Sequence, residues 1–389
     1  MVFYINKLKK NYVYYVSSII LGCLVILVLI LFSFFYFLKN KEHLSVENLI
    51  NLQILRKNIY SSPFHIDYTN YSIIKYSKLK PDVLIIGTST GQHISDNFSG
   101  KKVLKLNNNF YNLEMSEIFL KKIIKIHKPK IILYSLDWWV LNSNWTKKNN
   151  YVSLNYKNNN VKKNKSILSF SSSEYFSFYK WIILKKINYK NIFLEKKHIG
   201  ILANENFEGF TSWGNYLPSR ILIGSKDVNI DIKFQKSIER LKNKIWNFES
   251  FEIDNEAIKN LENIKNILHE NQINFIKFYP PISPYFFKIL EKERIDFIES
   301  NNKVVEGLDI LNLRSAEYYN DCMFLDALHS GETLMTYLVA KILLNEEIIT
   351  NEDFEGIEKL FKNNILRAYF PNSIYPLKEI DFLKIGCDK

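Results

Sequence analysis

The chain is poor in the residues that build metal sites, disulfide scaffolds and phosphate-binding loops. Its 389 residues include only three cysteines and twelve glycines. The cysteines, Cys23, Cys322 and Cys387, show no metal-ligand spacing; we favour isolated thiols, with a disulfide between the last two as the alternative. The sequence contains no phosphate-cradling Gly-Lys-Ser/Thr loop and no dinucleotide Gly-x-Gly-x-x-Gly motif. We therefore expect no metal and no cofactor.

Charge is also absent from one long stretch near the start. No charged residue occurs over 11–38, whose core reads IILGCLVILVLILFSFFYFL. About 20 apolar residues in a helix cross a bilayer, which predicts a transmembrane helix over 13–38. A cleaved signal peptide is the alternative, since Lys7, Lys9 and Lys10 give a basic start. The apolar stretch is too long for one, and bulky Phe and Tyr stand where a small-residue cleavage site would be.

The orientation of this helix follows from the basic residues around it. Those before the helix favour a cytoplasmic N-terminal segment, 1–12. The rest of the chain then lies outside the inner (cytoplasmic) membrane, held by a single pass. Lys39 and Lys41 on the far side count against this orientation, but large domains translocate despite such charges. We expect an extracytoplasmic, periplasmic domain.

The net charge of +12 raises the question of a nucleic-acid partner. Lysine is abundant throughout, and no single face or tail concentrates the positive charge. A basic composition without a focused patch is weak evidence for such binding. We expect no nucleic acid among the partners.

After a connecting segment over 39–80, short apolar runs alternate with segments of helical periodicity. The runs predict strands at 83–86, 103–106, 131–137, 273–279 and 310–313. Alternation repeated about five times argues for an α/β fold with a mostly parallel sheet covered on both faces.

The predicted domain covers 81–345 and contains one different region. Residues from about 142 to 250 are rich in Asn, Lys, Ser and aromatics and show no strong alternation, which favours an insertion of helices and loops. The C-terminal tail, 346–389, is charged and aromatic, and its sequence indicates no role.

Two segments bring chemically useful residues to the ends of predicted strands. In PDVLIIGTSTGQH, an apolar run stops at a hydroxyl-rich turn containing Ser89. Such a turn is often only a strand ending, but open α/β sheets also keep their active sites at this edge. In FLDALHSGE, Asp326 and His329 stand three residues apart, so both side chains reach one side of a turn. A nucleophilic serine needs such a base, and the base needs a partner that fixes its tautomer.

These two segments carry a family resemblance. DVLIIGTST resembles the nucleophile block of SGNH (GDSL-type) hydrolases, and DALH resembles their terminal Asp-x-x-His block. With its N-terminal helix, the chain is similar to the DltD proteins of teichoic-acid D-alanylation and to alginate O-acetylation proteins. The resemblance covers about 80–345 and implies a three-layer α/β/α fold with a five-stranded sheet. It also implies that Ser89 is the nucleophile, His329 its base and Asp326 the residue that orients the base.

The middle blocks of the family are altered here. The backbone N–H of Ser89 would supply one oxyanion donor. The family's Asn-Leu-x-x-x-Gly turn aligns with 107–112 and puts Asn112 in place of the glycine, as an oxyanion or substrate-binding position; Asn tolerates a positive φ better than most residues. SLDWW replaces the Gly-x-Asn-Asp block, with Asp137 at the strand end, so a third donor is not identified.

Further residues near these blocks have two interpretations each. His93 follows Ser89 by four residues, and we favour a half-exposed helix residue near the site over a second base, with Asp96 the nearest acid in sequence. Trp138 and Trp139 suit a sugar-stacking wall, and core or membrane-proximal packing explains them equally well.

The sequence therefore predicts a membrane-anchored O-acyltransferase or esterase, most simply one that handles acetyl groups on a cell-envelope glycan. A membrane-bound O-acyltransferase is a candidate partner. The alternative is a non-catalytic glycan-binding or scaffolding subunit of an envelope O-acylation complex, which the altered middle blocks favour.

Overall fold

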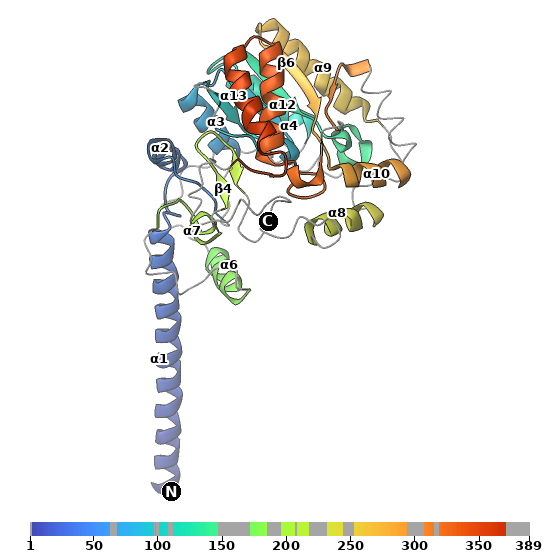
Figure 1. The fold of residues 1–389 in the computed structure, drawn as a ribbon. Coiled ribbons are helices and arrows are strands. Elements are labelled where there is room, and N and C mark those ends of the chain that lie inside the picture. Colours follow the sequence, from blue (N-terminus) through green and yellow to red (C-terminus); the bar gives the residue numbers. More distant parts are fainter. Residues whose placement is uncertain are drawn as a thin grey trace.

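The computed structural model describes residues 2–62, 68–96, 98, 101–107, 112–146, 172–184, 196–206, 208–217, 232–243, 253–293, 307–314 and 319–370. A long N-terminal helix, α1 (Val2–Lys39), projects from an α/β body (Figure 1). The other helices are α2 (Val46–Arg56), α3 (Tyr68–Leu79), α4 (Leu113–Ile123), α6 (Ser172–Ile183), α7 (Ile201–Asn206), α8 (Ile232–Lys242), α9 (Asn255–Glu270), α10 (Pro284–Glu293), α12 (Glu332–Asn345) and α13 (Asn351–Lys362). Short 3₁₀ helices include η1 (Ser89–Gly91), η2 (Trp138–Leu141) and η6 (Asp321–Met323).

The body is built on a five-stranded sheet in which every pairing is parallel. Its strand order is β2-β1-β3-β6-β7. The strands are β1 (Val83–Gly87), β2 (Val103–Lys105), β3 (Ile131–Ser135), β6 (Asn274–Tyr279) and β7 (Leu311–Asn312). Each overlaps one of the apolar runs that predicted a strand, and β1 extends one residue beyond its run, so the prediction of an α/β fold with five parallel strands is confirmed.

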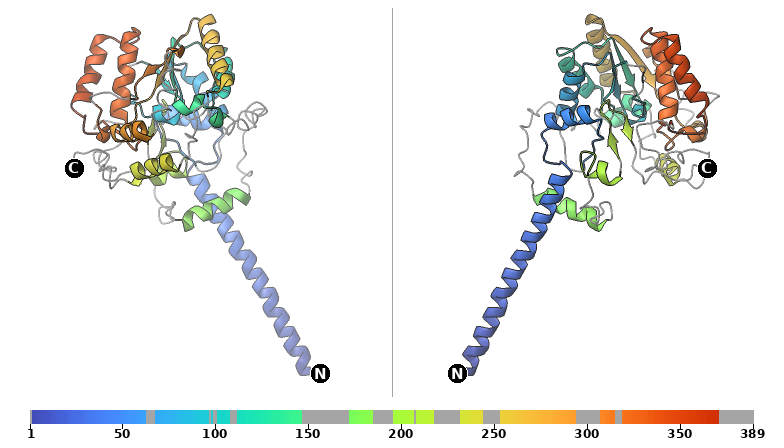
Figure 2. Two further views of the ribbon diagram at one scale, coloured as in Figure 1. Left: turned by 90° about the vertical axis from the view of Figure 1, so that its right-hand side faces the viewer. Right: turned by 60° about the vertical axis from the view of Figure 1, so that its left-hand side comes forward.

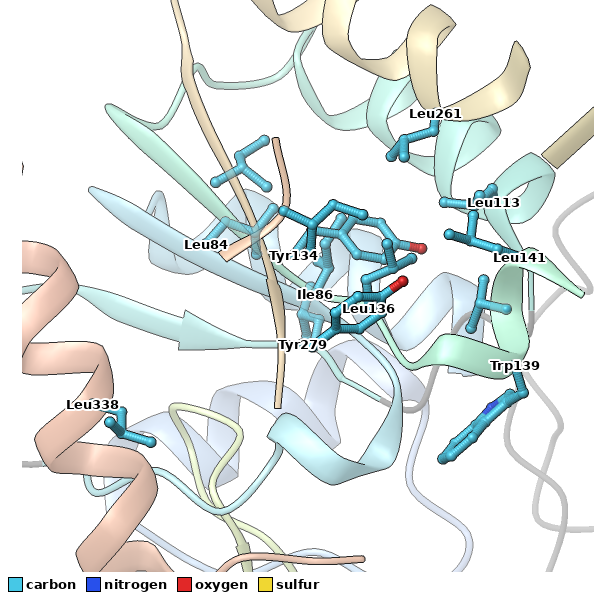
Figure 3. Packing of buried hydrophobic residues seen from close by; sticks show 14 of the residues in the cluster. Leu84, Ile86, Leu113, Tyr134, Leu136, Trp139, Leu141, Leu261, Tyr279 and Leu338 are labelled. Atoms are coloured by element: carbon cyan, nitrogen blue, oxygen red, sulfur yellow. The ribbon is translucent and has the colours of Figure 1, made fainter. Parts of the chain in front are cut away.

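Helices contribute side chains to both faces of this sheet. Leu84 and Ile86 of β1 belong to a cluster that includes Leu113 of α4 and Leu261 of α9, as Figure 3 shows. Val83 and Ile85 point the other way, into a cluster with residues of α12 and α13. Successive residues of a strand face opposite sides, so a central strand with helices on both faces must be apolar throughout. All five residues of β1 are buried.

α1 is long and apolar enough to cross a membrane. The candidate span is Tyr12–Lys39, close to the 13–38 predicted from sequence, and most of it is exposed to the surroundings. The helix also continues toward the N-terminus to Val2.

The insertion contains a feature that the sequence did not predict. β4 (Gly209–Phe210) and β5 (Tyr216–Leu217) form an antiparallel hairpin between helices. The backbone of Phe210 exchanges two 2.9 Å hydrogen bonds with Tyr60, which also forms a bridge with Ile199. The next residue, Gly200, donates its N–H to the carbonyl oxygen of Asn40 at 2.8 Å. We call this hydrogen-bonded connection between the hairpin and the end of α1 the linking layer.

The C-terminal part returns to the sheet edge. α13 packs beside α12, and the carbonyl of Ala368 then accepts a 3.0 Å hydrogen bond from the N–H of Thr333 in the first turn of α12. Cys322 is disulfide-bonded, so our interpretation of isolated thiols does not hold for it; Cys387 lies outside the described residues.

Candidate active site

Gly87 sets the direction in which the chain leaves β1. Its φ is +119°, and a Cβ there would come within 2.0 Å of the carbonyl oxygen of Ser135 on the neighbouring strand β3. Only glycine fits, because L side chains avoid this φ and the neighbour is backbone. The next residue, Thr88, donates its N–H to the same carbonyl at 3.1 Å. Ser89 therefore begins η1 at the carboxyl end of β1, as predicted.

The structure brings Ser89, His329 and Asp326 together from two ends of the domain. The hydroxyl oxygen of Ser89 lies 3.0 Å from Nε2 of His329. On the other side of the ring, Nδ1 lies 3.0 Å from Oδ1 and 2.9 Å from Oδ2 of Asp326. A carboxylate can only accept, so Nδ1 carries a proton and Nε2 is left to accept the proton of Ser89. All three side chains are partly exposed, which leaves the site open to a substrate.

Asp326 is held by more than the imidazole. Its Oδ1 accepts the backbone N–H groups of Leu328 and His329, each at 2.9 Å. Burial by itself raises the pKa of Asp326, but the charge and hydrogen bond of His329 and these two N–H groups outweigh it. The net pKa lies below the usual range. The carboxylate therefore stays ionised at neutral pH and stabilises a protonated His329.

Beneath Ser89 lies a second, fully buried carboxyl group. The hydroxyl of Thr90 donates to both oxygens of Asp137, at 3.1 and 3.0 Å, and lies 2.9 Å from the hydroxyl of Thr88. Burial raises the pKa of Asp137 to about 7, although the two threonines and the nearby His329 lower it. The sequence placed Asp137 at a strand end but gave no sign that it supports the Ser89 turn.

Asn107 is a residue that the sequence named only as the start of a block. It is buried, and its Nδ2 donates to the carbonyl oxygen of Thr88 at 3.2 Å. A Cβ at Gly91 would lie 3.0 Å from this Nδ2 and 2.5 Å from the hydroxyl of Ser135, so the turn approaches both side chains closely. Oδ1 of Asn107 and Oγ of Ser135 are buried without a hydrogen-bond partner among the described residues. Among the described residues, two unpartnered polar atoms therefore lie close to the turn that carries Ser89.

Asn112 does not have the positive φ that its alignment with a glycine predicted, and its oxyanion or substrate-binding role stays a prediction. Its φ is −148°, not positive, and its side chain caps α4 by accepting the N–H of Met115 at 3.0 Å. It lines a cavity of about 190 Å³ together with residues of α4 and α9 and Thr146, and none of Ser89, Asp326 or His329 lines that cavity. The alignment assumed a glycine-type turn, whereas the local geometry is that of a helix N-cap, where Asn is favoured.

His93 is buried, not half-exposed, and it lies beyond the end of η1 on no helix. Its Nδ1 lies 3.0 Å from the carbonyl oxygen of Tyr216 and 3.1 Å from the hydroxyl of Tyr369. The ring centroids of His93 and His329 are 6.2 Å apart. Asp96, the acid nearest in sequence, instead pairs with Lys105 at 2.7 Å. His93 therefore joins the hairpin and the C-terminal segment behind the site, a contact that sequence could not reveal.

Of the two tryptophans after β3, the structure describes the side chain of Trp139. Trp139, labelled in Figure 3, is buried in the main core. Its ring centroid lies 6.2 Å from that of Trp145. The packing interpretation therefore applies to it. The side chain of Trp138 lies outside the described residues.

In the part of the chain that the structure describes, no group of three or more His, Cys, Asp or Glu side chains is placed to hold a metal ion. No protein-family model, curated protein or solved structure matches the chain. The site must therefore be interpreted from its own geometry, which is that of a serine, a base and an orienting carboxylate hydrogen-bonded in series.

Proposed function

We propose that the chain is a membrane-anchored serine acyltransferase or esterase of the SGNH type, with a three-layer α/β/α catalytic domain. The observation that carries the proposal is the series of contacts from Ser89 through His329 to Asp326, at about hydrogen-bond distance on both sides of the ring. Ser89 and His329 are 240 positions apart in the sequence, yet the hydroxyl of Ser89 faces the ring nitrogen that can accept its proton, as activation of a nucleophile needs. Support also comes from the position of Ser89 at the carboxyl end of a parallel strand.

The proposed reaction has two steps. Oγ of Ser89 attacks the acyl carbonyl carbon while Nε2 of His329 takes the hydroxyl proton. The tetrahedral intermediate collapses, the acyl–oxygen bond breaks, and His329 gives its proton to the departing alcohol. A glycan hydroxyl or a water molecule then attacks the acyl-serine and loses its proton to His329. The bond between the acyl carbon and Oγ of Ser89 breaks, and His329 returns the proton to Oγ, which completes transfer or hydrolysis respectively. Asp326 holds the ring orientation and stabilises the imidazolium in both steps.

The oxyanion needs hydrogen-bond donors aimed at the developing charge. The backbone N–H of Ser89 is one candidate, because the first N–H groups of a helical turn have no partner within that turn. We assign the amide of Asn107 as a second, since it donates one N–H to the carbonyl of Thr88, the residue directly before Ser89, and has a further N–H. It takes the place of the donor that the sequence did not identify.

The proposed substrate is an acyl group, most simply acetyl, on an extracytoplasmic cell-envelope glycan. A helix long and apolar enough to span a membrane, and the linking layer between the hairpin and the end of that helix, support a substrate close to the membrane. A membrane-bound O-acyltransferase that supplies the acyl group is the proposed partner.

The test uses the full chain in lipid and a fluorophosphonate, which labels activated serines irrespective of the natural acyl group. Ser89→Ala should abolish labelling and lower acetyl-ester turnover by roughly 10²-fold or more. Ser177→Ala, which removes a hydroxyl from α6, is the matched control and should label as the wild type. Wild-type protein that does not label, combined with glycan acylation in cells that requires the protein but not Ser89, would instead establish the scaffolding alternative.

A further inference from the structure

The exposed part of α1 has the length of a bilayer core. From Tyr12 to Leu31 the helix is almost wholly exposed, whereas other parts of the protein begin to cover it at Phe32. At 1.5 Å per residue these 20 residues span about 30 Å, the thickness of the hydrocarbon region. Exposed aromatic residues stand at both ends, including Tyr14 at one and Phe35 at the other, and aromatic residues are enriched at the two membrane–water boundaries. If α1 spans a membrane, one boundary therefore lies close to Phe32.

α6 packs against α1 at this level. Figure 2 shows α6 crossing α1 near the point where α1 meets the α/β body. The ring of Phe178 lies 5.4 Å from that of Tyr36 and 5.2 Å from that of Phe37, measured between centroids. The hydroxyl of Tyr179 donates to the carbonyl oxygen of Leu29, within the exposed stretch. The axis of α6 thus lies across α1 at the depth where the apolar stretch ends.

The opposite face of α6 is apolar and exposed. Phe176 is 73% exposed and Ile183 is 78% exposed, and Leu184, directly after the helix, is 53% exposed. Lys180 lies between them on the same face. The spacing of four, three and one residues puts all of them on one side of a helix. Large side chains exposed to this extent on one face indicate contact with something other than water.

We propose that α6 is an interfacial helix of the membrane that α1 spans, with Phe176, Ile183 and Leu184 inserted among the lipid chains. Tyr179 of α6 donates to Leu29 within the exposed stretch of α1, so α6 lies at the level where that stretch would meet lipid, which favours lipid over a separate protein. Lys180 suits this position, because its stem covers apolar surface while its ammonium reaches the headgroups. The proposal rests on α1 spanning a membrane and is independent of the serine chemistry.

Depth-dependent quenching tests this placement. The full chain, with Cys23→Ala to remove the free thiol, receives a nitrobenzoxadiazole fluorophore at Ile183→Cys or Phe176→Cys under non-reducing conditions. It is reconstituted in vesicles of phosphatidylcholine and phosphatidylglycerol that carry a spin label at a shallow acyl position. Leu360→Cys on α13, an exposed leucine on the body, is the matched control. The labels on α6 should be quenched at least twofold, and the control should not be quenched.

Equal quenching of the labels on α6 and of the control label would overturn the proposal. Equal quenching is the result expected if a protein partner, and not lipid, covers this face. Two positions on the same face guard against a local distortion at one of them. The same measurement on a chain that also carries Ser89→Ala should give unchanged quenching. Failure of fluorophosphonate labelling would therefore count against the serine chemistry alone, and failure of quenching on α6 would count against the interfacial helix alone.

Discussion

Asp326→Asn tests the proposed triad more sharply than removal of the side chain. Asp326→Ala would also delete the acceptor for the N–H groups of Leu328 and His329, so a folding defect would accompany any loss of activity. Asparagine has the same shape and one carbonyl oxygen. The two backbone donors require that oxygen at the position of Oδ1, and the amide NH₂ then occupies the position of Oδ2.

The expected loss of activity in Asp326→Asn follows from the group that the new NH₂ faces. Oδ2 lies 2.9 Å from Nδ1 of His329, so asparagine presents a donor where the imidazole also donates. The remaining oxygen already accepts two N–H groups. The ring is expected to move its proton to Nε2, which then donates to Ser89 and cannot accept its proton. Loss of the correct tautomer usually costs roughly 10⁴-fold, or about 5.5 kcal/mol of activation free energy.

The assay is the second-order rate constant of fluorophosphonate labelling at pH 7, with the modified residue identified by mass spectrometry. A rate within threefold of the wild type would refute the assigned role of Asp326, and modification at any residue other than Ser89 would refute the assigned nucleophile.

The pH dependence of stability gives a second readout for Asp326→Asn. The folded pKa of Asp326 is depressed, so its contribution is present above the unfolded pKa of 3.8 and is lost as the pH falls. The difference in melting temperature between wild type and variant should therefore shrink at lower pH.

The remaining predictions concern the support of the site. Gly87→Ala should lower the free energy of unfolding by about 3 kcal/mol or more, because the new Cβ would meet the carbonyl of Ser135 at a strained φ. Its control, Gly356→Ala on a helix with open space around it, should raise the melting temperature. Asn112→Val should cost about 1 kcal/mol through loss of the helix cap and Asn112→Asp almost nothing, and equal melting temperatures would contradict the capping role. Burial raises the folded pKa of Asp137 to about 7 from 3.8, so protonation favours the folded state and the wild type should lose stability as the pH rises through this window, by up to about 4 kcal/mol. Asp137→Asn should flatten that dependence in thermal unfolding at pH 5 and pH 8, and an unchanged slope would show that Asp137 does not cause it.

The strands, and the positions of Ser89 and of the Asp326–His329 pair, could be predicted because local patterns indicate them. The runs that became β1 and β3 are apolar at every position, as central strands of a parallel sheet must be. Each half of the triad follows a strand in the sequence, and parallel strands bring their carboxyl ends to one edge. The pairing of Ser89 with His329 also drew on the family resemblance, because a shared sheet edge does not by itself bring two particular side chains into contact.

The failures have two different physical causes. For Asn112, the local signal was present: an Asn directly before a helix with Glu114 in its first turn is a typical N-cap, and the family alignment took precedence over it. For His93 and Tyr369, 276 positions apart, no local signal exists. Such a contact depends on the path of the β4–β5 hairpin and the C-terminal segment, which packing of the whole domain decides.

The linking layer has a kinetic consequence if α1 spans a membrane. Hydrogen bonds continue from Asn40 at the end of α1 through Gly200 and Tyr60 to the hairpin, whose Tyr216 contacts His93 beside the site. The site is thus attached to the membrane by folded structure at one fixed height. If the proposed transfer acts on a polymer that grows away from the surface, each segment of the polymer passes this height once. The pattern of acylation would then record the ratio of the rate of extrusion to the rate of transfer.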